Sequence, residues 1–154
     1  MSSPATVRIA IVVSRFNSAV TDNLLEGARE AATAHGVLCD DADVFHVPGA
    51  FELPLVARAA ALRDRYAAVV CLGAVIRGET PHFDYVCQET AAGIGRVSLE
   101  TGKPVAFGVL TTDDIEQALE RAGGAVGNKG YEGVVTVLET LETLAKVRSA
   151  GSAA

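Results

Sequence analysis

Short apolar runs alternate along the chain with longer segments in which apolar residues recur every three or four positions. The runs predict buried strands, and the longer segments predict helices with one apolar face. The predicted strands cover residues 8–13, 42–47, 68–75 and 104–110. The first predicted helix contains residues 24–32 and ends at Gly36. Four more helices are predicted over residues 51–66, 82–100, 114–122 and 131–148.

This order of elements predicts the fold class. Each of the first three strands is followed by a helix and the fourth by two, which predicts right-handed crossovers between parallel strands. We therefore expect an α/β protein, a three-layer flavodoxin-like sandwich whose four-stranded parallel sheet has helices on both faces. Neither a linker nor a repeat interrupts the sequence, so we predict a single domain over residues 1–154 with residues 1–6 and 149–154 as frayed tails.

Composition narrows the functional classes. The chain is 49% hydrophobic but only 5% aromatic, which suits a parallel sheet covered by helices. A formal net charge of −6 and the lack of a Lys/Arg cluster argue against nucleic acid as a partner. The three cysteines are expected to be small core residues, because they show no CxxC pairing. Without a signal peptide or an apolar run long enough for a membrane, we expect a soluble cytoplasmic protein.

The most distinctive stretch is CLGAVIRGETPHFDYV, residues 71–86. In it a buried strand leads into a glycine-containing turn and then into a predicted helix that starts at His82. The first amides of a helix have no internal partners and its N-terminal end is positive, so the turn is suited to bind an anion. The same positive end disfavours a charged imidazole, so we expect His82 to be available in its neutral form. An ordinary strand–helix connection remains the alternative.

Other unusual residues are predicted at the same end of the sheet. Phe16 follows the first strand, residues 50–52 follow the second, residues 78–82 follow the third, and Thr111 follows the fourth. Ligands of parallel sheets bind outside the carboxyl ends of the strands. We therefore predict that these four segments meet at one rim and form a site there.

Common nucleotide, metal and hydrolase motifs do not account for this rim. Gly93 and Gly95 lie inside a predicted helix, whereas a dinucleotide fingerprint follows the first strand. Residues 123–130, GGAVGNKG, resemble a phosphate loop, but they lie between two helices and Lys129 precedes a glycine. The histidines have no zinc-site spacing, and a GxSxG nucleophile elbow is absent.

The remaining candidates are a neutral histidine, an anion-binding turn, an aromatic side chain and two cations, Arg121 and Lys129. This set suits a small phosphorylated substrate beside a planar one, with proton transfers and no metal. From the residues alone, solvated surface charges are the usual interpretation of Arg121 and Lys129.

Four segments resemble a known family: VPGAFELP (47–54), CLGAVIRGETPHFDYV (71–86), FGVLTTDDIEQALERAG (107–123) and GNKG (127–130). Together they are similar to lumazine synthase, the 6,7-dimethyl-8-ribityllumazine synthase of riboflavin biosynthesis. The resemblance implies a transferase that needs no cofactor. It would condense 5-amino-6-(D-ribitylamino)uracil with 3,4-dihydroxy-2-butanone 4-phosphate, releasing phosphate and water.

The resemblance also implies roles for individual residues. His82 would be the proton shuttle. Phe16 would stack on the pyrimidine ring. Ala50, Phe51 and Glu52 would hold the pyrimidine and its ribityl chain, with Glu52 accepting hydrogen bonds from the ribityl hydroxyls. Ala74, Val75 and Ile76 would contact the ring through their backbone groups. The phosphate of the ketone would be held by helix-start amides of Gly78, Glu79 and Thr80, with Arg121 as its counter-charge. Lys129 would lie near the same substrate, and Phe107 would line the pocket. Many members carry serine at the place of Ala50, so backbone groups would have to replace its hydroxyl.

In the family the site lies between neighbouring subunits of a homopentamer. The short connection at residues 123–130 resembles that of members that assemble 60-subunit icosahedral shells, and riboflavin synthase is a possible partner. Two alternatives remain: a non-catalytic flavin- or lumazine-binding protein, and a shell whose main role is to enclose another enzyme.

Overall fold

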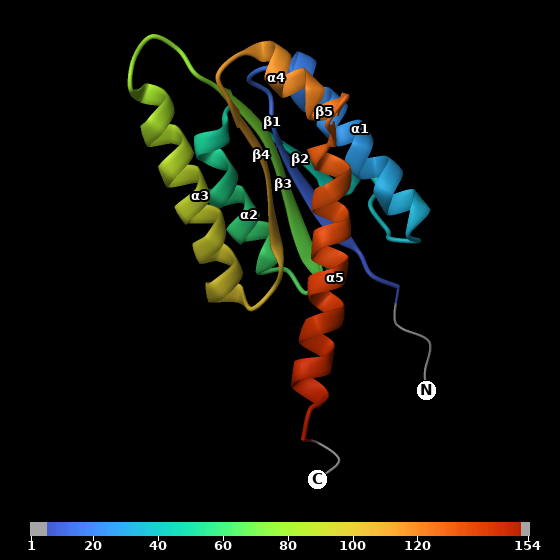
Figure 1. Cartoon of the computed structure of the whole chain (residues 1–154). Helices are drawn as coiled ribbons and strands as arrows, with labels where there is room; N and C mark the ends of the chain where they lie inside the picture. Colours follow the sequence, from blue (N-terminus) through green and yellow to red (C-terminus); the bar gives the residue numbers. More distant parts are fainter. Residues whose placement is uncertain (1–5, 152–154) are drawn as a thin grey trace.

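A computed structural model describes residues 6–151, in which a four-stranded sheet lies between two layers of helices (Figure 1). The sheet strands are β1 (Ile9–Ser14), β2 (Val44–Val47), β3 (Ala68–Ile76) and β4 (Val105–Thr112). The helices are α1 (Ser18–Ala34), α2 (Leu53–Ala61), α3 (His82–Thr101), α4 (Ile115–Glu120) and α5 (Lys129–Ser149). Two 3-10 turns, η1 (Asp41–Asp43) and η2 (Ala50–Glu52), flank β2, and β5 (Ala122–Gly124) and β6 (Gly127–Asn128) form a small hairpin.

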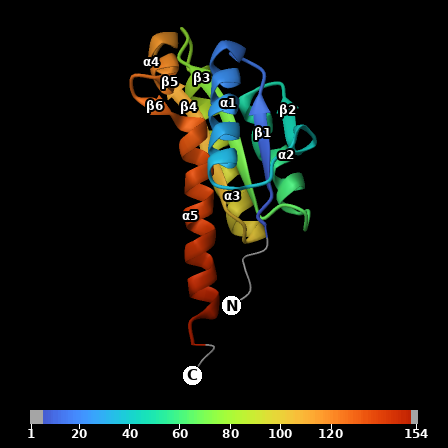
Figure 2. The same ribbon diagram turned by 90° about the vertical axis from the view of Figure 1, so that its right-hand side faces the viewer.

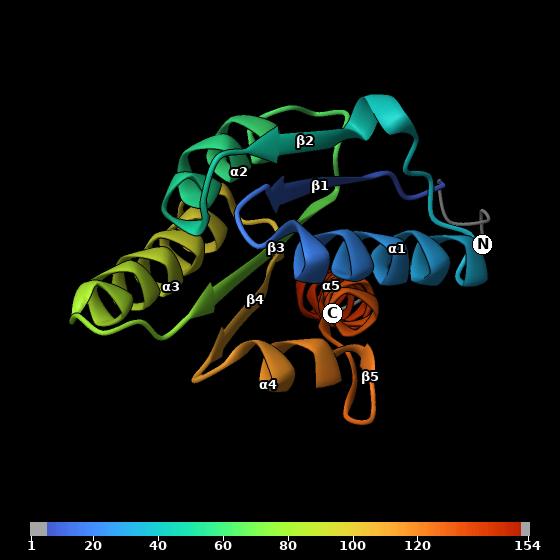
Figure 3. The ribbon, with the colours of Figure 1, turned by 90° about the horizontal axis from the view of Figure 1, so that it is seen from above.

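The sheet confirms the predicted α/β class. Its strands are all parallel in the order β2-β1-β3-β4, with Val12 opposite Phe45 on one side and Cys71 on the other. Helices α1 and α5 cover one face and α2 and α3 cover the other (Figures 2 and 3). This is the strand order of flavodoxin-like sheets, in which ligands bind where the winding reverses, here between β1 and β3.

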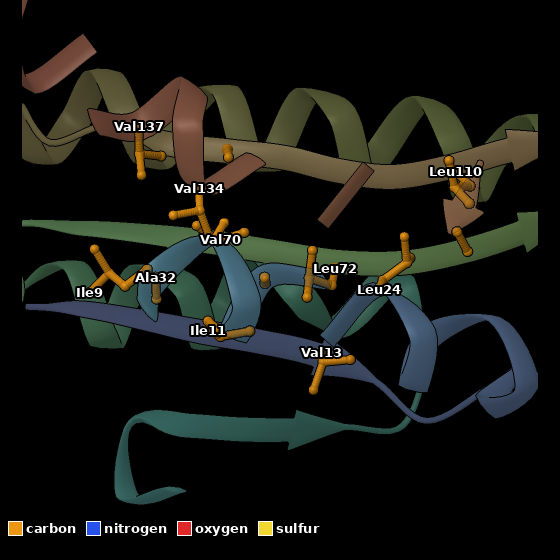
Figure 4. Packing of buried hydrophobic residues seen from close by; sticks show 14 of the residues in the cluster. Ile9, Ile11, Val13, Leu24, Ala32, Val70, Leu72, Leu110, Val134 and Val137 are labelled. Atoms are coloured by element: carbon orange, nitrogen blue, oxygen red, sulfur yellow. The ribbon is translucent and has the colours of Figure 1, made fainter. Parts of the chain in front are cut away.

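Strand β1 explains why the sheet needs both helical layers. All six of its residues are buried, so neither face is left to solvent. Ile9, Ile11 and Val13 pack in a cluster with α1 and α5 (Figure 4), whereas Ala10 and Val12 pack in a second cluster with α2 and α3. The apolar run in the sequence therefore reflects burial on both faces.

Gly93 allows helix α3 to pack closely against α2. A Cβ atom at Gly93 would lie only 2.7 Å from Cγ of Pro54, so the absence of a side chain lets α3 approach α2. A Cβ atom at Gly95 would meet nothing within 4 Å, so Gly95 has no such role.

Several predicted boundaries differ from those of the structure. Helix α2 ends at Ala61 rather than near Tyr66, because the Arg63 amide donates to the carbonyl of Ala60, three residues back, instead of continuing the α-helical pattern; Tyr66 lies beyond the helix and donates its hydroxyl to Asp43 at 2.8 Å. Residues 123–130 form most of the β5–β6 hairpin rather than an open connection. Helix α5 begins at Lys129, where the Asn128 side chain accepts from the amides of the next turn. The predicted tails, residues 1–6 and 149–154, lie mostly outside the described residues, but Ser149 belongs to α5.

A buried carboxylate, Asp43, fixes the end of the sheet opposite to the strands' carboxyl ends. Its side chain is fully buried and accepts hydrogen bonds from Arg8, Arg65, Tyr66 and the Asp40 amide. Burial alone would raise the pKa of Asp43, but these donors outweigh burial and lower the pKa to about 2. The network joins the start of β1 to η1 and to the segment before β3.

We expect Asp43→Asn to lower the free energy of unfolding by about 2 kcal/mol near neutral pH, because a neutral amide cannot satisfy two guanidinium groups. The carboxylate has a lower pKa in the folded chain than its ordinary value of 3.8. Its stabilisation is therefore complete above about pH 4 and is lost as the pH falls toward about 2. Urea unfolding at several pH values should show the two proteins converging in acid. The exposed Asp41, changed to Asn, is the control and should have little effect.

Candidate active site

The loops that follow β1, β2 and β3 enclose a cavity of about 700 Å³, called here the first cavity. It lies at the carboxyl ends of the strands, near the reversal of winding between β1 and β3. Ten of the predicted site residues line it: Phe16, Ala50, Phe51, Glu52, Ala74, Val75, Ile76, Gly78, Thr80 and His82. Sequence reasoning missed five other lining residues: Pro48, Gly49, Phe83, Tyr85 and Val86.

Phe16 stands at the mouth of this cavity with 71% of its surface exposed. Its amide donates to the Pro48 carbonyl at 3.0 Å, which ties the loop to the end of β2. The next residue, Asn17, has φ 65°, the only positive φ among non-glycine residues of the described chain, and donates from Nδ2 to the Ala74 carbonyl at 2.9 Å. Asparagine tolerates this left-handed conformation better than most residues. The loop is thus anchored to both neighbouring strands and presents an aromatic face.

The turn after β2 supplies a small floor and a carboxylate. Ala50 is buried at 7% exposure, while the neighbouring Phe51 is 58% exposed and adds a second ring to the cavity wall. Glu52 accepts from the Gly49 amide through Oε1 at 2.9 Å, which fixes its side chain. Its other oxygen keeps its capacity to accept from ligand hydroxyl groups.

The loop after β3 confirms the predicted start of helix α3 at His82. His82 is exposed and lines the first cavity together with Gly78 and Thr80. The Thr80 hydroxyl accepts weakly from the His82 amide at 3.4 Å. Glu79 lies in the same loop but does not line the cavity. The positive N-terminal end of a helix beside an imidazole can bind an anion and move a proton.

The remaining three predicted residues, Phe107, Arg121 and Lys129, line a second cavity of about 360 Å³. This second cavity lies along the edge strand β4, beside the hairpin and the first turn of α5. Arg121 donates from Nη1 to the Gln117 carbonyl at 2.9 Å, and the Lys129 amide donates to the Arg121 carbonyl at 2.9 Å. These contacts fix the Arg121 guanidinium group and the backbone of Lys129 at one wall of the second cavity.

In a single chain, the four segments predicted at one rim divide between two cavities. Three of them form the first cavity, whereas Thr111 lines the second. The reason is that the chain leaves β4 toward α4 and α5, away from α2 and α3 (Figure 3). One chain carries two partial sites.

The cysteines offer no ready nucleophile. Cys71 is fully buried, and desolvation raises its pKa to about 12; Cys39 is half-buried, and desolvation raises its pKa to about 11. Desolvation also raises the pKa of the half-buried Cys87. The expectation that all three are core residues thus holds only for Cys71.

Residues 6–151 show neither a metal cluster nor a membrane span. In that part of the chain no three His, Cys, Asp or Glu side chains gather closely enough to hold a metal ion. None of its helices combines the length and apolarity that a bilayer span requires.

A flavodoxin-like sheet with a partly apolar cavity outside its strand ends defines an α/β protein with a small-molecule site. Aromatic rings, one carboxylate and a helix start furnish the contacts of that site. The model of one protein family, described as 6,7-dimethyl-8-ribityllumazine synthase, matches residues 6–145. Because the match covers most of the 154 residues, the chain belongs to the 6,7-dimethyl-8-ribityllumazine synthase family. The resemblance of the four sequence segments is thereby confirmed.

Proposed function

We propose that this protein condenses 5-amino-6-(D-ribitylamino)uracil with 3,4-dihydroxy-2-butanone 4-phosphate to give 6,7-dimethyl-8-ribityllumazine, phosphate and water. The family supports a role in riboflavin biosynthesis. The observation that carries the specific reaction is the first cavity, where an aromatic platform, a carboxylate and a helix start with a histidine converge. We also propose that the chain forms one domain and that the reaction takes place in the cytoplasm.

The two substrates have different requirements, and the lining residues match them. Phe16 would stack on the planar pyrimidine, and Glu52 would accept hydrogen bonds from the ribityl hydroxyls. The strand end at residues 74–76 would contact the ring through its backbone groups. Residues 78–80 would hold the phosphate of the ketone through their amides at the start of α3.

The chemistry needs proton transfers at each stage. The amine of the uracil attacks the ketone, and the resulting carbinolamine loses water to give an imine. Phosphate then leaves by elimination, and the ribityl-bearing amine attacks the ketone that this step uncovers, closing the ring with loss of a second water. His82 can give and take these protons because an imidazole ring has one nitrogen that can donate a proton and one that can accept it. Holding both substrates in one cavity would provide much of the acceleration.

We further propose that a second copy of the chain completes the site. The first cavity has a histidine and amides but no lysine or arginine in its lining, whereas the second cavity has Arg121 and Lys129. Joining the first cavity of one copy to the second cavity of its neighbour would place a cation against the phosphate. A pentamer would repeat this junction around a ring, and a 60-subunit shell with a bound riboflavin synthase would be a further level of assembly.

We expect the purified protein to accelerate lumazine formation when both substrates are mixed, as measured by lumazine fluorescence. The spontaneous reaction and heat-denatured protein are the controls. A rate no higher than the spontaneous one would overturn the proposed enzyme. If riboflavin still bound in that case, the alternative of a flavin or lumazine carrier would take its place. Electron microscopy of the same sample distinguishes pentamers from shells.

A further inference from the structure

We propose that Arg77 is a positioning residue that holds the loop before His82 and connects it to Arg121. This inference rests on the proposed function of the two cavities, because it concerns residues assigned there to the substrate phosphate. Arg77 lines neither cavity. It would therefore act through the groups that it holds rather than by touching a substrate.

The side chain of Arg77 contacts two separate elements. Its Nε donates to Asp113 at 2.9 Å, just beyond the end of β4, and its Nη1 lies 3.7 Å from the Asp84 carboxylate in the first turn of α3. The centre of the guanidinium group lies 4.4 Å from the centre of the Phe83 ring. The backbone adds a fourth contact, since the Arg77 amide donates to the Thr112 carbonyl at 2.8 Å.

These contacts bracket the loop of residues 78–81. Arg77 precedes this loop, while Phe83 and Asp84 follow it, so one guanidinium group fixes both of its ends. The loop itself is exposed, and a Cβ atom added at Gly78 would meet nothing within 4 Å. Since packing does little to hold the loop, its shape depends on how its ends are held. Phe83 also lines the first cavity, so the guanidinium group lies directly behind the cavity wall.

A chain of contacts continues from Arg77 to the second cavity. The amide of Asp113 donates to Oε1 of Gln117 at 2.9 Å, and Arg121 donates from Nη1 to the Gln117 carbonyl at 2.9 Å. Asp114 completes this arrangement by accepting from the Gln117 amide at 2.8 Å, which caps α4. Arg77 is thus joined to Arg121 through two residues, and each link is a hydrogen bond within the same chain.

Energetics favour a positional role over a stabilising one. The side chains of Arg77, Asp84 and Asp113 are 49%, 53% and 67% exposed, and ion pairs this exposed stabilise a protein little. An arginine is nevertheless required, because a planar guanidinium group can stack on the Phe83 ring while it donates to Asp113 and lies in ion-pair range of Asp84. Lysine has no planar fork, so it can keep the charge but not the complete set of contacts.

The test compares Arg77→Met and Arg77→Lys with Arg58→Met. Arg58 is a matched control, because it also forms a half-exposed ion pair, with Glu100, but contacts neither cavity. In Arg77→Met, amide hydrogen exchange should become about fivefold to tenfold faster in peptides covering residues 78–86 and 113–121. Arg77→Lys should lie between this variant and the wild type. Arg58→Met should leave both peptides unchanged.

Kinetics give a second readout on the full-length enzyme. Arg77→Met should raise KM for the phosphorylated ketone about tenfold and leave KM for the pyrimidine nearly unchanged. Unchanged exchange in residues 78–86, or faster exchange throughout the chain, would overturn the positioning role. Faster exchange confined to residues 78–86 would overturn the connection to Arg121. If the wild type makes no lumazine, the proposed function fails, but the exchange experiment still decides the role of Arg77.

Discussion

Replacing His82 with alanine is expected to slow turnover by about 10²–10⁴-fold, the range typical of general acid–base groups. The imidazole lines the first cavity at the start of α3, and the proposed reaction moves a proton at each of its stages. The substrates should still bind, because the stacking ring and the helix-start amides remain. Steady-state measurement of lumazine formation should therefore show a fall in kcat with little change in either KM.

The control for this variant is His35→Ala. His35 lies at the end of α1, where its Nδ1 is 2.9 Å from the Ala31 carbonyl, and it lines neither cavity. Its removal should leave kcat within about twofold of the wild type. One limb of the wild-type pH–rate profile should vanish in His82→Ala. A profile of unchanged shape would remove His82 from the proton transfers.

Replacing Arg121 with alanine is expected to raise KM for the phosphorylated ketone about 100-fold, through loss of a charge-assisted hydrogen bond to the phosphate. The pyrimidine should bind almost as before, because Arg121 lies in the second cavity and the pyrimidine contacts lie in the first. Arg121→Lys should recover part of the loss by restoring the charge. Separate titrations of each substrate at saturating levels of the other measure the two effects.

The control for Arg121 is Arg29→Ala on α1. Arg29 pairs with Asp41 at 3.0 Å and lines neither cavity, so neither KM should change. Equal losses for both substrates in Arg121→Ala would contradict its assignment to the phosphate. An unchanged KM would mean that Arg121 is a solvated surface cation.

Local patterns predicted the part of the site built by consecutive residues. The apolar run of β3, the glycine of the turn and Pro81 before His82 define a strand, a loop and a helix start within one short segment. The same reasoning could not find Phe83 and Val86. Their apolar side chains fit the buried face of a helix equally well, and only the packing of α3 turns them toward the cavity.

Long-range contacts determined what the sequence could not show. Beyond the end of helix α2, Tyr66 bonds with Asp43, a residue 23 positions away, which no local pattern encodes. The β5–β6 hairpin has strands of three and two residues. Strands this short cannot show an alternating pattern of apolar and polar residues. The division of the site into two cavities depends on the direction in which the chain leaves β4, which no single segment encodes.

That division has a consequence for mixtures of intact and altered chains. If the two cavities join between copies, every chain contributes to two junctions, one through its histidine side and one through its arginine side. A chain with an inactivating substitution on one side would inactivate one junction, but it would still contribute a functional half to the other. Activity in a mixed population would then follow the number of intact junctions rather than the number of intact chains, so two different defective alleles could partly compensate for each other.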